Sequence, residues 1–414
     1  MTPGTKVEKR RPDGGPRVGS GSDRAPASVW TGLALTTLAW LLSRAVVTVT
    51  WGPARNPLTF DPYLWGRVDS INYLGIAQHG RTFGRCGTPG FPTDGLAQSL
   101  HLVWCGSAGW LPGFPWLTHV LGTTGYSLPD GGLLISWVSV AAALFLVWVG
   151  WGRDLPPGRA FVVLVLFGLF PGSVYNFAFF PTSLALACVV GGTVAAVRQH
   201  YFVGALLMTL AGLCYPSAWF AAAGLAVGMV LLALPHGWAT VIRRAAWGVA
   251  GLASLLVIGV HDQIAFGHAS AFFIMDGGPD LRVQGVPGSD LVELLIHRNS
   301  NEQVAIGRFG GAVLAVQGLA AMALGIAGGV LSLRRWRGPE AAAEVYPALI
   351  GLAVLGGIIL EAAAAGSWNR SVVLAAPCVV CFRRLPLAVL VPIALVVGTG
   401  TAIVSHYFFN GTLI

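Results

Sequence analysis

One acidic residue, Asp69, lies shortly after the first apolar stretch of a chain that is otherwise strongly hydrophobic. Arg67, Tyr73 and His79 surround it in the segment 65–80, WGRVDSINYLGIAQHG. A carboxylate at a membrane interface can act as a general base toward an acceptor hydroxyl, because partial dehydration raises its pKa toward neutrality. Asp69 can instead be a solvated loop residue, or it can lie at a helix N-terminus that stabilises its charge.

Two arginines at the ends of apolar segments are candidates for binding phosphate. Arg44 lies near the end of the first apolar stretch, and Arg370 follows Trp368 and Asn369 just before a late one. An arginine at membrane depth is costly and tends to be functional, and its planar fork matches a phosphate group. The alternative for both residues is that the side chain extends to the interface and binds nothing.

Other polar residues carry weaker signals. His261 and Asp262 end an apolar segment, and Glu361 lies inside another. One histidine beside one aspartate is not a metal site without further ligands, and the alternative is that both residues simply end a helix at the interface. Cys378 and Cys381 have the spacing of a metal-binding pair, but no second pair or histidine cluster accompanies them. We therefore predict no metal ion and no cofactor.

The composition indicates a polytopic integral membrane protein. Hydrophobic residues make up 55% of the 414 positions and charged residues only 10%, and the mean hydropathy is +0.69. Soluble proteins carry about 25% charged residues. Apolar runs of roughly 18–20 residues fit helices that cross a hydrocarbon core of about 30 Å. The net charge of +8 is explained by basic residues beside the membrane, so nucleic acid is not an expected partner.

We predict an all-α bundle of about eleven transmembrane helices. The expected spans are 28–50, 131–151, 160–178, 180–197, 201–215, 217–234, 246–265, 311–331, 346–363, 371–382 and 386–405. Pro216 is expected to break the chain between the fifth and the sixth span. Two interfacial helices, 70–79 and 114–121, are expected after the first span, and the apolar side of 70–79 is expected to lie on the membrane.

Basic residues set the predicted orientation. Residues 1–27 are rich in Gly, Pro, Arg and Ser and should form a disordered tail rather than a signal peptide, and the membrane domain occupies 28–414. Placing this tail in the cytoplasm puts arginines on every inner loop and most acidic residues on the outer ones. The chain is therefore expected to be a multi-pass plasma-membrane protein with Asp69 on the extracytoplasmic face.

Two long outer loops are expected, at about 51–130 and 266–310. Loops of this length in a compact protein usually carry function. Cys86 and Cys105 are the two cysteines of the outer face, where they either form a disulfide bond or stay free thiols.

The segment around Asp69 resembles a family signature. Residues 67–80, RVDSINYLGIAQHG, are similar to the Arg-Trp-Asp…Tyr-Leu-x-Ile-Ala-x-x-Gly pattern of the PIG-V-like mannosyltransferases of the GT-C superfamily. Further similar stretches, in the same order, are Leu42–Arg44, Gly113–Leu117, Phe170–Ser183 and Trp368–Arg370. The chain is identified on this basis as a divergent bacterial member, in which Val68 and Thr182 replace a Trp and a Glu of the family.

The resemblance implies a GT-C fold and a polyprenyl-phosphate sugar, with mannose as the expected hexose, as co-substrate. It also implies that Asp69 activates the acceptor hydroxyl as a base and that Arg370, with Arg44 or Arg67, holds the donor phosphate. The candidates for binding the substrates are His79, Tyr73, Asp262 and Trp368. The acceptor can be a glycolipid, a protein, a cell-wall polymer or a secondary metabolite.

Two other classes of function stay open. A transporter or flippase for a lipid or solute would have discontinuous helices in two corresponding halves, whereas the sequence shows no internal repeat. A non-catalytic membrane scaffold that descends from the enzymes is compatible with the replacements at Val68 and Thr182.

Overall fold

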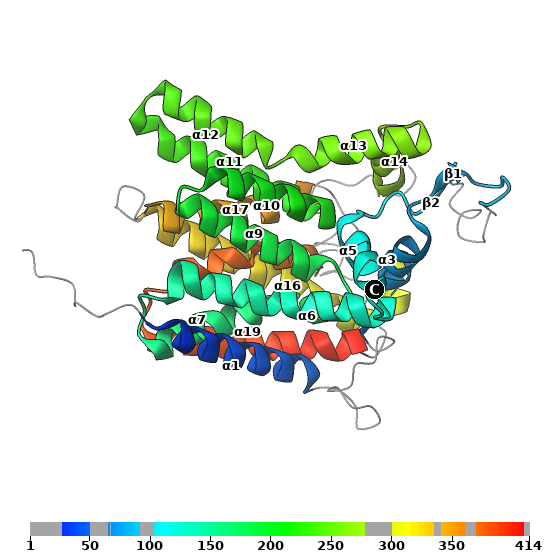
Figure 1. Cartoon of the computed structure of the whole chain (residues 1–414). Coiled ribbons are helices and arrows are strands. Elements are labelled where there is room, and N and C mark those ends of the chain that lie inside the picture. Colours follow the sequence, from blue (N-terminus) through cyan, green and yellow to red (C-terminus); the bar gives the residue numbers. More distant parts are fainter. Residues whose placement is uncertain are drawn as a thin grey trace, which may run out of the picture.

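Most of the described chain is helical (Figure 1). A computed structural model describes residues 27–49, 65, 66, 68–91, 103–277, 300–334, 341–360 and 370–409. The helices that reach ten residues are α1 (Val29–Thr48), α3 (Val68–His79), α5 (Gly113–Gly122), α6 (Leu128–Val147), α7 (Pro157–Gly168), α9 (Thr182–Val197), α10 (Tyr201–Cys214), α11 (Ser217–Ala233), α12 (Trp238–Ala250), α13 (Ala253–Phe266), α16 (Ser300–Leu333), α17 (Ala341–Leu360), η3 (Val372–Phe382) and α19 (Leu387–Phe409). The shorter elements are η1 (Trp148–Gly152), α8 (Val174–Phe177), η2 (Leu234–His236), α14 (Ala271–Gly277) and the antiparallel strands β1 (Phe83–Arg85) and β2 (Trp104–Gly106).

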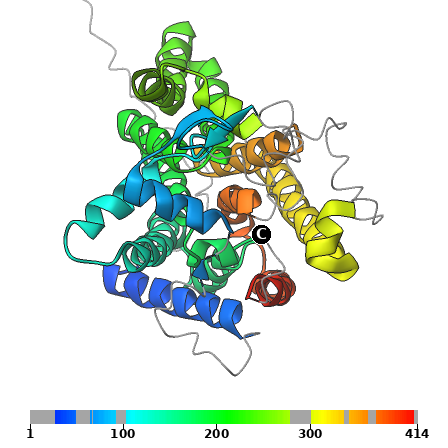
Figure 2. The same ribbon diagram turned by 90° about the vertical axis from the view of Figure 1, so that its right-hand side faces the viewer.

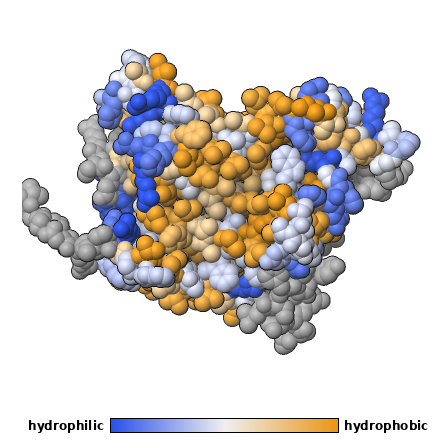
Figure 3. Space-filling model, viewed as in Figure 1, coloured by the Kyte–Doolittle hydropathy of each residue, from blue (hydrophilic) through white to orange (hydrophobic). Residues whose placement is uncertain are grey.

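Six helices in the described part of the chain are long and apolar enough to cross a membrane. They are α1, α6 with η1, α11 with η2, the Ala315–Ser332 part of α16, α17 and α19. A seventh crossing results if α12 and α13, which meet at a bend of 41°, count as one span. The prediction of an all-α, multi-pass membrane protein is therefore confirmed. An apolar band across the molecule separates two more hydrophilic ends (Figure 3).

The remaining predicted spans coincide with four shorter apolar helices, α7, α9, α10 and η3. The three α-helices among them have 12, 16 and 14 residues, so each reaches only about 18–24 Å at a rise of 1.5 Å per residue. That is less than the hydrocarbon core of about 30 Å. Eleven complete crossings therefore stay a prediction.

The expected span 246–265 falls on a bent pair of helices, because the structure breaks the chain between α12 and α13. Two glycines explain the break. A Cβ atom at Gly248 would lie 2.6 Å from the Ala226 Cβ, and one at Gly251 would lie 3.2 Å from the Met208 Cβ. Their absent side chains let α12 pack closely on α11 and α10, and α13 then leaves in a new direction.

Helix η3 lies at the centre of the bundle, and all of its residues are buried. It is a 3₁₀ helix with Pro377 inside it, and proline removes a backbone donor that an α-helix would use. Two glycines of neighbouring helices face Cys378 of η3. A Cβ atom at Gly328 of α16 would lie 3.1 Å from the Cys378 carbonyl oxygen, and one at Gly351 of α17 would lie 2.7 Å from the Cys378 Cβ. These small residues allow α16 and α17 to enclose η3.

A buried ionic cluster fixes one end of η3. Glu344, in the first turn of α17, is fully buried and lies 2.8 Å from Arg383, which follows η3 directly. Arg384 lies at 3.7 Å from the same carboxylate oxygen. Because Glu344 and Arg383 are both shielded from water, removing either charge would leave the other one buried without compensation.

Glu344→Ala should lower the free energy of unfolding by about 3–5 kcal/mol, because it leaves the Arg383 charge buried without its carboxylate. The matched control is Arg384→Ala, whose side chain is 41% exposed, and it should cost less than about 1 kcal/mol. Thermal unfolding of the two variants in detergent measures the difference. Equal shifts would show that the buried pair contributes no more than a surface one.

Candidate functional site

The carboxylate of Asp69 forms an ion pair with the guanidinium of Arg370. Asp69 lies in the first turn of α3, and Arg370 lies just before η3. Their side chains are 15% and 18% exposed, so the pair is accessible without being open to bulk water. The structure thus brings together two residues that are 301 positions apart in the sequence. Helix α3, which carries Asp69, lies at the end of the bundle that faces the viewer in Figure 2.

Helix α3 is held against the protein at its first turn. The hydroxyl of Ser70 donates a hydrogen bond of 3.0 Å to the carbonyl of Phe179. The amide of Phe179 in turn donates to the carbonyl of Trp65, also at 3.0 Å. These bonds place Asp69 at a defined position on the edge of the bundle.

The packing of α3 corrects one expectation. The helix forms as predicted, but Tyr73, Ile76 and Ala77 are buried against the protein rather than laid on the membrane. The Tyr73 ring packs edge-on against Phe114 and Phe180, with centroids 6.1 and 6.3 Å away. Tyr73 therefore supports α3, and its predicted contact with substrate stays a prediction. The second expected interfacial helix is α5.

A buried tyrosine supports the arginine side of the pair. The Tyr215 hydroxyl lies 3.2 Å from the Ser371 hydroxyl, and both residues are buried. Tyr215 has an extended backbone between the end of α10 and Pro216, which turns its ring toward η3. Sequence reasoning missed this contact. The sequence feature that could have indicated it is a tyrosine, with its hydroxyl group, directly before the helix-breaking Pro216.

Arg44 occupies an aromatic cage rather than an open surface. Its guanidinium carbon lies 3.6 Å from the Trp137 ring centroid, 5.5 Å from that of Trp40 and 5.6 Å from that of Trp65. Such contacts stabilise a cation at low exposure. The Trp65 carbonyl also accepts the hydrogen bond from Phe179, the residue that holds Ser70 of α3. Arg44 therefore supports the Asp69 region through Trp65. Its binding of donor phosphate stays a prediction.

Asp262 belongs to a second buried ion pair. Its oxygens lie 2.5 and 3.4 Å from the guanidinium of Arg81, and Oδ2 also accepts a hydrogen bond of 3.0 Å from the Phe272 amide. Arg81 donates further to the carbonyl of Ala108 and lies 3.2 Å from Nδ1 of His261. Asp262 is fully buried, so this geometry favours a structural role.

The Arg81 cluster fastens the first long loop to α13. Burial lowers the pKa of Arg81, and the carboxylate of Asp262 opposes that shift. The same loop contains a disulfide bond between Cys86, the residue after β1, and Cys105 in β2. The loop is therefore fixed by a covalent bond and by an ionic one.

Three predicted site residues cannot be placed with the pair. His79 is exposed at the other end of α3, about 15 Å from Asp69 along the helix axis at 1.5 Å per residue. Arg67 and Trp368 lie outside the described residues, as does Glu361. Among the residues that are described, no three His, Cys, Asp or Glu side chains form a group that could hold a metal ion.

Three solved structures of the oligosaccharyltransferase of Archaeoglobus fulgidus are similar to this chain. The one in complex with Zn and sulfate has a TM-score of 0.49 and 15% identity, over 91% of this chain and 53% of that one. The apo form has a TM-score of 0.46 and 11% identity, over 92% and 56%. The form tethered to an acceptor peptide with an NVT sequon has a TM-score of 0.46 and 13% identity, over 92% of this chain and 55% of that one.

The present chain therefore spans about half the length of these structures. At these TM-scores the similarity does not assign an activity. No family model and no curated protein matches the chain. The resemblance to the PIG-V-like mannosyltransferases stays a prediction.

Asp262→Ala should destabilise the protein by about 3–5 kcal/mol, because it leaves the Arg81 charge buried and unneutralised. Replacing both partners, by Arg81→Met with Asp262→Leu, should recover part of that loss, since no charge is then buried, although the Phe272 amide has lost its acceptor. Thermal unfolding and proteolysis of the first loop measure both effects. A double variant as unstable as the sum of its single variants would contradict this assignment.

Proposed function

We propose that this protein is a membrane glycosyltransferase of the GT-C type. It transfers a hexose, with mannose the proposed sugar, from a polyprenyl-phosphate donor to a hydroxyl of an acceptor. The observation that carries the proposal is the ion pair between Asp69 and Arg370 at the end of a membrane bundle. A base and a phosphate-binding cation are the two charged groups that such a transfer requires.

The reaction follows from the two charges. When the donor binds, Arg370 exchanges the carboxylate of Asp69 for the donor phosphate. The acceptor oxygen attacks the anomeric carbon of the sugar while the bond from that carbon to the phosphate oxygen breaks. Asp69 takes the hydroxyl proton, and polyprenyl phosphate leaves with the bonding electrons, stabilised by Arg370. The displacement inverts the anomeric centre, so a β-linked donor gives an α-linked product.

Partial burial suits both roles. A site that excludes most water strengthens the attraction between Arg370 and a phosphate group. Once Arg370 has bound the donor phosphate instead of Asp69, the same exclusion of water favours the protonated form of the Asp69 carboxyl group. Asp69 therefore becomes a better base when the donor is in place than in the resting ion pair.

We propose different roles for Arg67, Trp368 and Arg44. Arg67 and Trp368 are sequence neighbours of Asp69 and Arg370, so they are the first candidates to contact the donor. Arg44 supports this region through the Trp65 ring. We propose that the site lies on the extracytoplasmic face of the plasma membrane and that the N-terminus is cytoplasmic, because this orientation places the arginines of the short loops inside.

Asp69→Asn should lower sugar transfer by at least about 10²-fold, the usual contribution of a general base. The assay follows radiolabelled mannose from polyprenyl-phosphate mannose into acceptors in membranes that contain the variant. Asp130→Asn is the matched control, because Asp130 is another aspartate in the first turn of a helix and lies beside Ser127. Its transfer rate should equal that of the wild type.

Sugar transfer at the wild-type rate in a well-expressed Asp69→Asn variant would contradict the role of Asp69 as the base. If neither protein transfers sugar, either the proposed donor or the proposed enzymatic function is wrong.

A further inference from the structure

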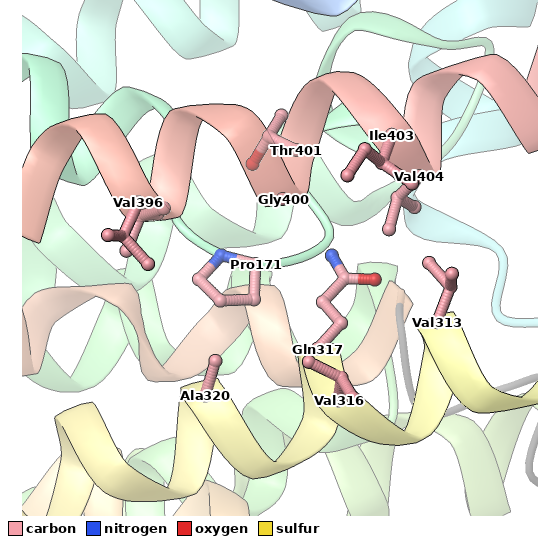
Figure 4. A pocket seen from close by; sticks show the side chains of 11 residues that line it. Pro171, Val313, Val316, Gln317, Ala320, Val396, Gly400, Thr401, Ile403 and Val404 are labelled. Atoms are coloured by element: carbon pink, nitrogen blue, oxygen red, sulfur yellow. The ribbon is translucent and has the colours of Figure 1, made fainter.

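A groove of about 340 Å³ lies between α16 and α19 (Figure 4). Its volume is within the range of small-molecule sites, at the lower end. The walls are almost entirely aliphatic, from Val313, Val316 and Ala320 on α16 and from Val396, Ile403 and Val404 on α19. Because both helices are long and apolar enough to span a membrane, this aliphatic groove suits a hydrocarbon chain.

One polar side chain points into the groove. Gln317 is 7% exposed, and its amide extends from α16 toward α19 and Pro171 (Figure 4). Neither its Oε1 nor its Nε2 has a hydrogen-bond partner in the described part of the protein. Thr401, the other polar residue of the wall with a side-chain donor, gives its hydrogen bond to the carbonyl of Leu169 at 2.8 Å.

An amide without partners in an apolar environment is costly, so Gln317 lowers the stability of the protein when no ligand pairs with it. A leucine of similar volume would avoid that cost. The chemistry of the amide also narrows the class of ligand. Its oxygen accepts and its nitrogen donates, whereas a fully ionised phosphodiester offers only acceptors. A hydroxyl group, which both donates and accepts, satisfies both atoms of Gln317.

The depth of Gln317 matches that of the proposed site. Helix α17 runs antiparallel to α16, since Gly325 faces Leu355 and Gly329 faces Leu352. It is also antiparallel to η3, since Glu344 pairs with Arg383 and Gly351 faces Cys378. Helices α16 and η3 therefore run in the same direction and touch where Gly328 meets Cys378.

Gln317 precedes Gly328 by eleven residues of α-helix, which is a distance of about 16 Å along the axis of α16. Arg370 precedes Cys378 by eight residues, most of them in the 3₁₀ helix η3, which is also about 16 Å along its axis. Gln317 and the Asp69–Arg370 pair therefore lie at about the same depth in the bundle.

We propose that this groove binds the acceptor and that the acceptor is a lipid whose headgroup carries at least two hydroxyl groups. The proposal rests on the proposed function. The hydrocarbon chain lies between α16 and α19, one hydroxyl binds Gln317, and a second hydroxyl reaches Asp69. The acceptor then enters sideways from the bilayer rather than from the aqueous phase.

The test uses a photoactivatable monoacylglycerol, which has one chain and two hydroxyls, and its acetonide, in which both hydroxyls are capped. The purified full chain is labelled in lipid nanodiscs, and the labelled peptides are identified by mass spectrometry. We expect labelling of α16 and α19 that falls about tenfold in Gln317→Leu, because two hydrogen bonds are lost. The acetonide should label the wild type as weakly as the monoacylglycerol labels that variant.

The matched control is Thr399→Val, which removes a hydroxyl from the neighbouring groove formed by α1, α7 and α19. It should be labelled like the wild type. Asp69→Asn should also be labelled normally, although its sugar transfer falls by at least about 10²-fold.

Equal labelling of wild type and Gln317→Leu in a preparation that transfers sugar would overturn the inference. Displacement of the probe by polyprenyl phosphate would also overturn it, since the groove would then hold the donor. Labelling that depends on Gln317 in a wild type that transfers no sugar would instead overturn the proposed function and leave a binding site for hydroxylated lipids.

Discussion

The ion pair between Asp69 and Arg370 is the contact on which the rest of the site depends. Each residue brings a charge to the boundary of a membrane domain, where an unpaired charge is expensive. Pairing offsets that cost and also joins α3 to η3, which come from opposite halves of the sequence. In the proposed reaction this pair is exchangeable, because the donor phosphate would take the place of the carboxylate at Arg370. On that proposal the ion pair holds the base and the phosphate-binding cation next to each other before the donor binds.

The surrounding structure keeps the two partners in position by separate means. On the Asp69 side, Ser70 donates a hydrogen bond to the turn before α9, and the segment just after α3 is held by the ion pair of Arg81 and Asp262. On the Arg370 side, Tyr215 contacts Ser371, and η3 is enclosed by α16 and α17. Both anchors are buried, so the geometry at the surface follows from packing in the interior.

Local features of the sequence predicted local features of the fold. The length and hydropathy of the spans predicted a multi-pass helical protein, and the apolar run after Asp69 predicted a helix that begins beside it. The disulfide between Cys86 and Cys105 was one of two open alternatives, and the structure contains it. These properties depend on composition and periodicity, which a single sequence displays directly.

Contacts between distant segments were beyond the reach of such patterns. In the cage of three tryptophans around Arg44, only Trp40 is related to Arg44 by a local spacing, four residues apart on α1. Trp137 of α6 and Trp65 before α3 come from distant segments. Arg81 gave no signal as a partner for Asp262, because only the folded loop brings them together. The bend between α12 and α13 arises from how closely two glycines approach neighbouring helices. Each of these features is a property of packing rather than of periodicity.

The most direct test of the central claim is the affinity of the purified protein for polyprenyl phosphate. If the phosphate competes with Asp69 for Arg370, then Asp69→Asn should bind polyprenyl phosphate more tightly than the wild type. Arg370→Gln should bind it at least about tenfold more weakly, because a charge-assisted hydrogen bond to the phosphate is lost. Affinities that fall together in both variants would contradict the account, since the ion pair would then be a purely structural contact.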